Sequence, residues 1–371
     1  MRKFDSKTTF IMRKTFFATL LLMMSISAFA GGMIPSSYDF SADNGEGVTL
    51  YYKNCEGGAM LVLPYYDSSS DPSWITWTEY VYTDPVINVP AMAGGLTVVA
   101  IDHNALYNSP SIQSITLPNT IKSIGGWAFA GDSSLTSINI PESVEYIGES
   151  AFNSTGLSSA HVSAKMAEWG MSLYQGCFNM QHVTFDEDVT VIPERIFFNC
   201  ERLKSVTLPA SVRKIDIGAF SACDSLAHIN LPANLDTIAF GAFTEAPLEE
   251  VIFPASLKNI QARAFRGIVA EEITSLIMEP AGVLEEEGIE GAYDWDTETS
   301  LPLPKLRVPK GTKALYQADP EWSKFTILEE GETEGFVHVR PAQKAYKTIR
   351  EGQLFILRDG KMYNALGVEM K

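Results

Sequence analysis

The chain has 371 residues, of which 46% are hydrophobic and 20% are charged, and its formal net charge at pH 7 is −17. This length is enough for one elongated body with a large core. A chain this acidic repels phosphate backbones, so its composition disfavours nucleic-acid binding.

The first thirty residues have the pattern of a secretory signal peptide. Arg13 and Lys14 precede an apolar run over residues 16–24, and Ala28-Phe29-Ala30 has the small-x-small form of a cleavage site. The run is too short to span a bilayer as a stable helix, and no later stretch is long enough for a membrane span. We therefore expect residues 1–30 to be removed on export, which would make the net charge −21.

Residues 31–95 are expected to form a β-rich N-terminal cap. Two apolar segments, 48–52 and 59–63, flank a polar turn and predict a hairpin. Eight aromatic residues fall between positions 51 and 82, two of them in the first of these segments. Either they form a stacking platform for sugars, centred on Trp74, Trp77, Tyr80 and Tyr82, or they close the open end of the next region. The second interpretation is favoured, because a stack of repeats needs a cap.

An internal repeat of 22 or 23 residues occupies positions 96–278. Its clearest mark is an aromatic residue or its substitute, at Leu106, Phe129, Phe152, Tyr174, Phe197, Phe220, Phe243 and Phe265. Five residues before each of these lies a second apolar column: Ile101, Ile124, Ile147, Trp169, Ile192, Ile215, Ile238 and Ile260. One unit is too short to bury its own apolar face, whereas stacked units bury a continuous core.

The residues around these columns predict short parallel strands, one coil per repeat. Segments such as Ile138-Asn139-Ile140 alternate with the two-residue period of a half-buried strand, and a proline that usually follows ends the strand. Gly125, Gly148 and Gly170 follow the isoleucine column, where a turn with positive φ would favour glycine, although Pro193, Asp216 and Ala239 at the same position show that glycine is not required. The predicted fold is mainly β, a solenoid of about eight coils.

The unit Leu135-Thr136-Ser137-Ile138-Asn139-Ile140-Pro141 with Val144, Ile147-Gly148 and Ala151-Phe152 resembles the BspA-like, or Treponema-type, leucine-rich repeat. The resemblance covers about half of the chain. It implies a leucine-rich-repeat solenoid with a role in adhesion.

Three of the four cysteines occupy one column, three residues after the repeat aromatic. These are Cys177, Cys200 and Cys223. Neighbouring members lie about one strand spacing, roughly 5 Å, apart, so a disulfide is conceivable in an exported protein. Buried free thiols are the favoured interpretation, because cysteine packs well as a small apolar residue and holds that role in the resembling family. No histidine column accompanies them, which disfavours a metal site.

The outward face of the main strand is expected to carry two polar columns. They form the candidate binding surface, which comprises Ser114, Thr116, Ser137, Asn139, His161, His182, Thr184, Ser205, Thr207, His228 and Asn230. Such side chains either hydrogen-bond along the stack or present a flat surface to a protein or glycan. Both interpretations stay open at this point.

Beyond residue 278 the period breaks. Residues 279–304 hold eight acidic residues and no basic one, which predicts a solvated excursion loop in preference to a calcium site. Residues 305–330 resemble the terminal capping unit of the same family, with a short helix starting near Thr312 and with Trp322 and Phe325 closing the core. Residues 331–371 are expected to hold a linker and a β-hairpin around Asp359-Gly360, similar to a segment found on exported proteins of Bacteroidetes-type bacteria.

Catalytic signatures are missing from the sequence. It has no Gly-x-Ser-x-Gly, no His-Glu-x-x-His and no phosphate loop, and its five histidines are scattered. We expect no catalytic, cofactor or metal residues. The predicted function is an exported, non-enzymatic recognition or adhesion protein, on the cell surface or outside the cell, with the periplasm as the alternative location. Its partner would be a protein or glycan of a host, matrix or bacterial surface. The alternatives are a glycan-binding envelope module using the N-terminal aromatics and, least favoured, a polysaccharide-active enzyme.

Overall fold

The computed structural model describes residues 38–62, 82–291, 293–294, 299–300 and 302–332, together with the backbone of four strands between 346 and 370. The chain divides into two units, Met1–Glu330 and Gly331–Lys371. The predicted signal peptide, Trp74, Trp77 and Tyr80 lie outside the described residues.

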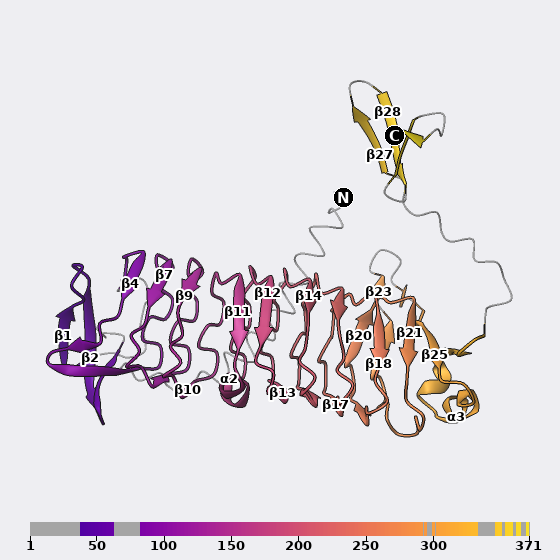
Figure 1. The fold of residues 1–371 in the computed structure, drawn as a ribbon, viewed down its shortest axis with the longest axis horizontal. Helices are drawn as coiled ribbons and strands as arrows, with labels where there is room; N and C mark the ends of the chain where they lie inside the picture. The colour runs from indigo at the N-terminus through magenta and orange to yellow at the C-terminus, as the bar shows by residue number, and fades with distance from the viewer. Residues whose placement is uncertain are drawn as a thin grey trace, which may run out of the picture. The chain divides into compact units, whose positions relative to one another are not determined.

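The first unit is a solenoid whose coils follow one another in a single row (Figure 1). One side of each coil contributes a strand to the main sheet, and these strands pair in parallel with the next coil in four successive ladders. In chain order they are β4 (Val86–Asn88), β7 (Ser114–Thr116), β9 (Ser137–Ile138), β11 (Ser159–Val162), β12 (His182–Phe185), β14 (Ser205–Val206), β16 (His228–Ile229), β18 (Val251–Phe253), β21 (Glu272–Ser275), β25 (Lys305–Val308) and β26 (Thr326–Glu329). The predicted solenoid of parallel strands is confirmed.

A second side carries strands around the isoleucine column, the first of six residues and each of the others of two. They are β6 (Leu96–Ile101), β8 (Ser123–Ile124), β10 (Tyr146–Ile147), β13 (Val191–Ile192), β15 (Lys214–Ile215), β17 (Thr237–Ile238) and β19 (Asn259–Ile260). The unit with Met166 differs, because it has helix α2 (Ala164–Trp169) where the other units have a short strand. Ser163 caps it by accepting from the backbone N–H of Met166 at 3.2 Å. The second side is thereby divided into two separate ladders.

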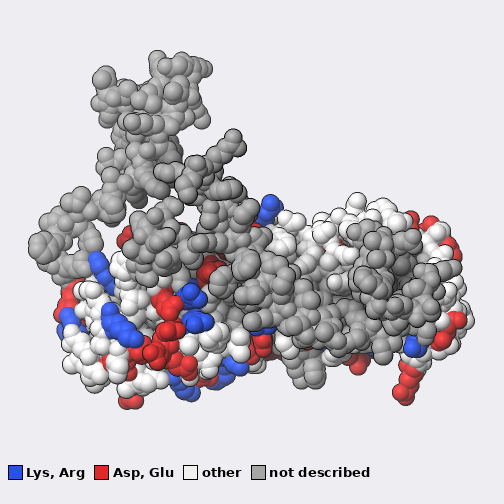
Figure 2. Space-filling model, turned by 180° about the vertical axis from the view of Figure 1, so that it is seen from behind, with Lys and Arg blue, Asp and Glu red and all other residues white. Residues whose placement is uncertain are grey.

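Charges of opposite sign face one another across adjacent coils of this second side. Lys122 pairs with Glu145 at 3.2 Å, and Asp236 lies 2.9 Å from both Arg213 and Lys258. The two cations, through their side-chain hydrogen bonds, lower the pKa of the Asp236 carboxyl below its ordinary value. Figure 2 shows Lys and Arg interleaved with Asp and Glu over the C-terminal coils, on the left of that view.

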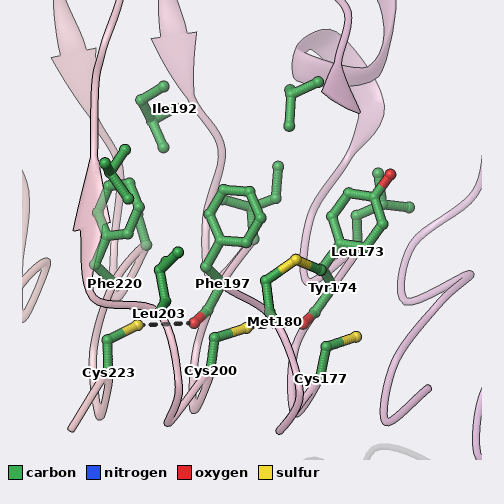
Figure 3. Close-up of a cluster of buried hydrophobic side chains, with 14 of the residues drawn as sticks. Leu173, Tyr174, Cys177, Met180, Ile192, Phe197, Cys200, Leu203, Phe220 and Cys223 are labelled. Carbon is green, nitrogen blue, oxygen red and sulfur yellow. Dashed lines mark hydrogen bonds between the residues drawn. The ribbon is translucent and has the colours of Figure 1, made fainter. Parts of the chain in front are cut away.

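The repeat aromatics form one buried stack along the solenoid (Figure 3). Ring centroids of consecutive coils lie 5.1 to 5.9 Å apart from Phe129 to Phe265, with nearly parallel planes. Each ring fills the space between its neighbours, so the core is continuous and no coil is packed by itself.

The cysteine column runs beside this stack, and all three thiols are free and fully buried. Each Sγ donates to the backbone carbonyl of the aromatic in the preceding coil, as Cys200 does to Tyr174 at 3.3 Å and Cys223 to Phe197 at 3.2 Å (Figure 3). Burial raises the pKa of Cys177 to about 11 and of Cys223 to about 12. The three cysteines are therefore buried, protonated thiols, as the favoured interpretation of the sequence predicted.

The prediction of positive φ at Gly125, Gly148 and Gly170 is wrong. The left-handed residues lie two before and two after the aromatic, as Arg195 (φ 52°) and Asn199 (φ 60°) do around Phe197. Gly125 and Gly148 are needed for close approach instead, because an added Cβ would lie 2.4 and 2.3 Å from a backbone nitrogen of the preceding coil. Gly170 ends helix α2 with φ −82°.

The N-terminal end is closed by antiparallel strands, as predicted. They are β1 (Phe40–Asp43), β2 (Thr49–Cys55) and β3 (Gly58–Leu61), and β3 continues in parallel onto β6, which also pairs with β5 (Met92–Ala93). Tyr52 and Tyr82 are buried in the core under this sheet. The predicted hairpin and the cap interpretation of Tyr82 are therefore confirmed.

The acidic excursion is partly a ninth coil, which corrects the predicted loop. Leu284 bridges to Ile260, and β22 (Ile289–Gly291) pairs in parallel with β20 (Phe265–Ile268). Two of its carboxylates form ion pairs with the preceding coil, since Glu287 lies 3.7 Å from Arg263 and Glu290 lies 3.2 Å from Arg266. The repeat pattern did not predict this coil, because Ile289 occupies the position that is aromatic in most of the other coils. A short pair, β23 (Tyr293–Asp294) and β24 (Thr299–Ser300), follows.

The C-terminal end of the solenoid is capped by helix α3 (Lys313–Ala318) and a short 3₁₀ helix, η3 (Trp322–Lys324). Trp322 is fully buried, and its Nε1 donates to the Pro280 carbonyl at 3.0 Å. Thr312 precedes α3 without a side-chain capping bond. The predicted capping helix, with Trp322 and Phe325 in the core, is confirmed.

The second unit is a four-stranded antiparallel sheet of β27 (Tyr346–Arg350), β28 (Gln353–Arg358), β29 (Lys361–Asn364) and β30 (Glu369–Met370). Arg358 pairs with Lys361, which places a hairpin where the sequence predicted one. Asp359 and Gly360 lie outside the described residues.

Candidate binding surface

The outward face of the main sheet brings the two predicted polar columns together. Strand alternation turns the intervening residues inward, so that Ile115 and Val206 are buried while Thr116, Ser205 and Thr207 are exposed. The parallel register aligns like positions between coils: Ser114 with Ser137, Ser159 with His182, His161 with Thr184, and Ser205 with His228. The residues of each column therefore lie next to one another on the surface, one from each coil.

Two asparagines on this face form hydrogen bonds that connect adjacent coils. Asn139 accepts from the backbone N–H of Leu117 at 2.7 Å and donates back to its carbonyl at 2.8 Å. Asn230 makes the same pair of bonds with Leu208 at 2.7 and 3.0 Å. Each side-chain amide makes the two hydrogen bonds that a backbone neighbour in a β-ladder would make. These two residues therefore hydrogen-bond along the stack and are not free to bind a partner.

His161 is also held by its neighbours. Its Nε2 lies 2.9 Å from Oδ1 of Asp186, and its Nδ1 lies 2.9 Å from the hydroxyl of Thr184. Because the carboxylate only accepts, Nε2 donates, and in the neutral ring Nδ1 accepts from Thr184. Oδ2 of Asp186 accepts from the backbone N–H of Ala164 at 3.2 Å, which links this pair to the start of helix α2. The repeat pattern does not single out Asp186, because this residue follows directly after the repeat strand β12.

The remaining candidates make no side-chain hydrogen bond within the described part of the chain. They are Ser114, Thr116, Ser137, His182, Ser205, Thr207 and His228, and all but half-buried Ser114 are exposed. Nothing in the packing of the solenoid requires these side chains. They are the part of the predicted surface that is available to a partner.

The aromatic platform loses one of its four proposed members. Tyr82 is 2% exposed, and its hydroxyl donates to the Val62 carbonyl at 3.4 Å. Burial raises its pKa above the ordinary value. A ring inside the core cannot stack on a sugar.

Among the described residues, no three His, Cys, Asp or Glu side chains gather as metal ligands. No helix of the described part is long and apolar enough to cross a membrane.

The family model described as "BspA type Leucine rich repeat region" matches residues 95–181 and 167–272, in six copies. The repeat region belongs to the BspA-type leucine-rich repeat family. Leucine-rich repeats of this kind are in general protein-interaction modules and not enzymes.

Three solved structures illustrate what this chain is similar to. The leucine-rich repeat protein TpLRR of T. pallidum is 23% identical, with 53% of this chain and 86% of that chain covered and a TM-score of 0.43. A leucine-rich repeat protein from Bacteroides ovatus ATCC 8483 is 18% identical, with 79% and 90% covered and a TM-score of 0.47. A leucine rich cell surface protein from Faecalibacterium prausnitzii A2-165 is 16% identical, with 75% and 97% covered and a TM-score of 0.34. The comparison with curated proteins found no significant match.

The structural role of the asparagines is open to a direct test. Replacing Asn230 by alanine is expected to lower the free energy of unfolding by about 1 to 3 kcal/mol, because the backbone N–H and carbonyl of Leu208 lose their partners. Thr207→Ala, on the same face, should change it by less than about 0.5 kcal/mol. Urea denaturation measures both. Equal stability of the two variants would mean that the amide bonds are dispensable.

Proposed function

We propose that this chain is an exported, non-enzymatic recognition protein of the adhesion type, which presents the outward face of its main sheet to a protein of a host, matrix or bacterial surface. The observation that carries the proposal is the set of exposed, aligned side chains that the stack does not use, among them Ser137, His182 and Thr207. Solenoids typically use such extended faces for binding. The BspA-type family and its general role in protein interaction support the same conclusion.

Export is proposed from the N-terminal sequence. The apolar run over residues 16–24 and Ala28-Phe29-Ala30 have the form of a signal peptide and its cleavage site. Protease shaving of intact cells of the source bacterium, followed by detection of this chain, tests the location. Loss of the protein would support surface display, whereas protection would favour the periplasm.

The proposed surface is tested with variants that place bulk and charge on one face at a time. Ser137→Arg with Thr207→Arg alters the main sheet, and Thr190→Arg alters a threonine on the second side that is also exposed. Binding of the purified chain to immobilised matrix proteins and mucins is expected to fall for the first variant and to persist for the second. Equal loss in both variants, or no binding by the unaltered chain, would overturn the proposal. Binding confined to free glycans would favour the glycan-binding alternative.

A further inference from the structure

The outward face of the main sheet changes character at its C-terminal coils. As far as Asn230, its two columns carry hydroxyl, amide and imidazole groups, and the next outward residues are Glu250 and Ile252. Three large apolar side chains are then exposed: Ile252 by 45%, Leu276 by 47% and Met278 by 55%. We call these three residues the apolar patch.

The strand geometry places the patch on a single face. Ile252 pairs with Thr274 in the parallel register of β18 and β21, and the backbone N–H of Leu276 donates to the Phe253 carbonyl at 2.9 Å. Ile273, Ser275 and Ile277 point into the core, so Thr274, Leu276 and Met278 point outward with Ile252. The three apolar side chains therefore lie on the outward side of two adjacent coils, on the same face as the proposed binding surface.

The surroundings of the patch are acidic. Glu249 and Glu250 are exposed just before Ile252, and Glu279 is exposed just after Met278. The neighbouring strand β25 carries two cations, Lys305 and Arg307. The charge of Arg307 is balanced by Glu272, whose Oε1 and Oε2 lie 2.6 and 2.9 Å from its Nε and Nη2. The whole chain adds a negative field, with a net charge of −17.

An apolar centre with a charged rim is the usual arrangement of a protein-binding hot spot. We propose that the apolar patch is the anchor point of the recognition surface, and that it docks a basic amphipathic protein segment. Apolar side chains of that segment would cover Ile252, Leu276 and Met278, and its Lys or Arg side chains would face Glu249, Glu250 and Glu279. This inference rests on the proposed function and names the partner class and the site within that face.

Binding to the full chain is measured with three labelled peptides of equal length. Leucine alternates with lysine in the Leu–Lys peptide, leucine with glutamate in the Leu–Glu peptide, and serine with lysine in the Ser–Lys peptide. Fluorescence anisotropy is expected to show binding of the Leu–Lys peptide, about tenfold weaker binding of the Ser–Lys peptide, and none of the Leu–Glu peptide. Leu276→Ser with Met278→Ser should reduce the affinity for the Leu–Lys peptide to that of the Ser–Lys peptide. Glu249→Gln with Glu250→Gln should weaken binding of both basic peptides and reduce its salt dependence.

The matched control is Met171→Ser with Ile217→Ser, two apolar residues exposed by 43% and 36% outside the main sheet. This control should bind the Leu–Lys peptide as the unaltered chain does, and melting temperatures should agree among all variants. The inference is overturned if the Leu–Glu peptide binds equally well, or if the patch variant retains full affinity. Its failure is distinct from that of the proposed function, which stands if Ser137→Arg with Thr207→Arg still abolishes binding to matrix proteins.

Discussion

Replacing Phe197 by alanine is expected to lower the free energy of unfolding by about 3 to 5 kcal/mol. The ring is fully buried, and its centroid lies 5.9 Å from that of Tyr174 and 5.7 Å from that of Phe220. Its removal opens a cavity in the middle of the stack and takes a contact from the coil on either side. Phe220→Ala should have a similar effect, because its ring also lies between two others. Thermal and urea unfolding measure both variants.

Phe178→Ala is the matched control, since that ring is 48% exposed. The stability of this variant should change by only about 0.5 kcal/mol. If Phe197→Ala and Phe220→Ala melted at the same temperature as the unaltered chain, the aromatic column would not be the core of the solenoid.

The stability of the chain is expected to fall as the pH rises from about 4 to about 9, because of Asp132. This carboxyl lies in the cysteine column and is fully buried, and burial raises its pKa from 3.8 to about 9. Its Oδ1 accepts from the backbone N–H of Ser109 at 2.7 Å, while its Oδ2 has no partner among the described atoms. Within that window the folded state keeps the proton that the unfolded state has released. The titration of this carboxyl therefore lowers the free energy of unfolding by about 1.4 kcal/mol for each pH unit within the window.

Asp132→Asn removes the titrating group and keeps an oxygen for the Ser109 N–H. Urea unfolding at pH 5 and pH 8 should show a smaller loss of stability in this variant than in the unaltered chain. Asp236→Asn is the control, since its half-buried carboxyl, paired with Arg213 and Lys258, has a lowered pKa and titrates below the window. An identical pH profile for Asp132→Asn and the unaltered chain would show that Asp132 is ionised in the folded state.

The sequence predicts the solenoid well because its core columns obey one spacing. Phe129, Phe152 and Phe197 are placed by the same contacts in every coil, so a repeated residue type reports a repeated environment. The caps follow from the same logic, since apolar residues such as Trp322 have to close the open ends.

The mistaken predictions lie where local geometry departs from the residue pattern. Gly125 is glycine because of the backbone of the neighbouring coil, and that distance is invisible in a single repeat. The ninth coil has Ile289 in place of the aromatic residue, so its spacing did not reveal it. Helix α2 in the Met166 unit was not predicted, because that unit keeps the spacing of the repeat but not its residue types.

The binding surface was only half predictable from the sequence. The two-residue period identifies which residues point outward but not how they bond across coils. Thr207 and Asn230 look equivalent in the sequence, yet only Asn230 clamps a neighbouring backbone. The apolar patch was not predicted, because Leu276 and Met278 follow the end of β21, where the aromatic spacing that marks the repeat has already ended at Phe265.

Site-specific photo-crosslinking tests most directly whether the main sheet is the recognition surface. A photoreactive phenylalanine analogue at Thr207 reports on the main sheet, and the same analogue at Thr190 reports on the second side; both positions are exposed. With immobilised matrix proteins and mucins as partners, covalent products are expected from position 207 and not from position 190. Products from position 190 alone, or equal products from both, would contradict recognition through the main sheet.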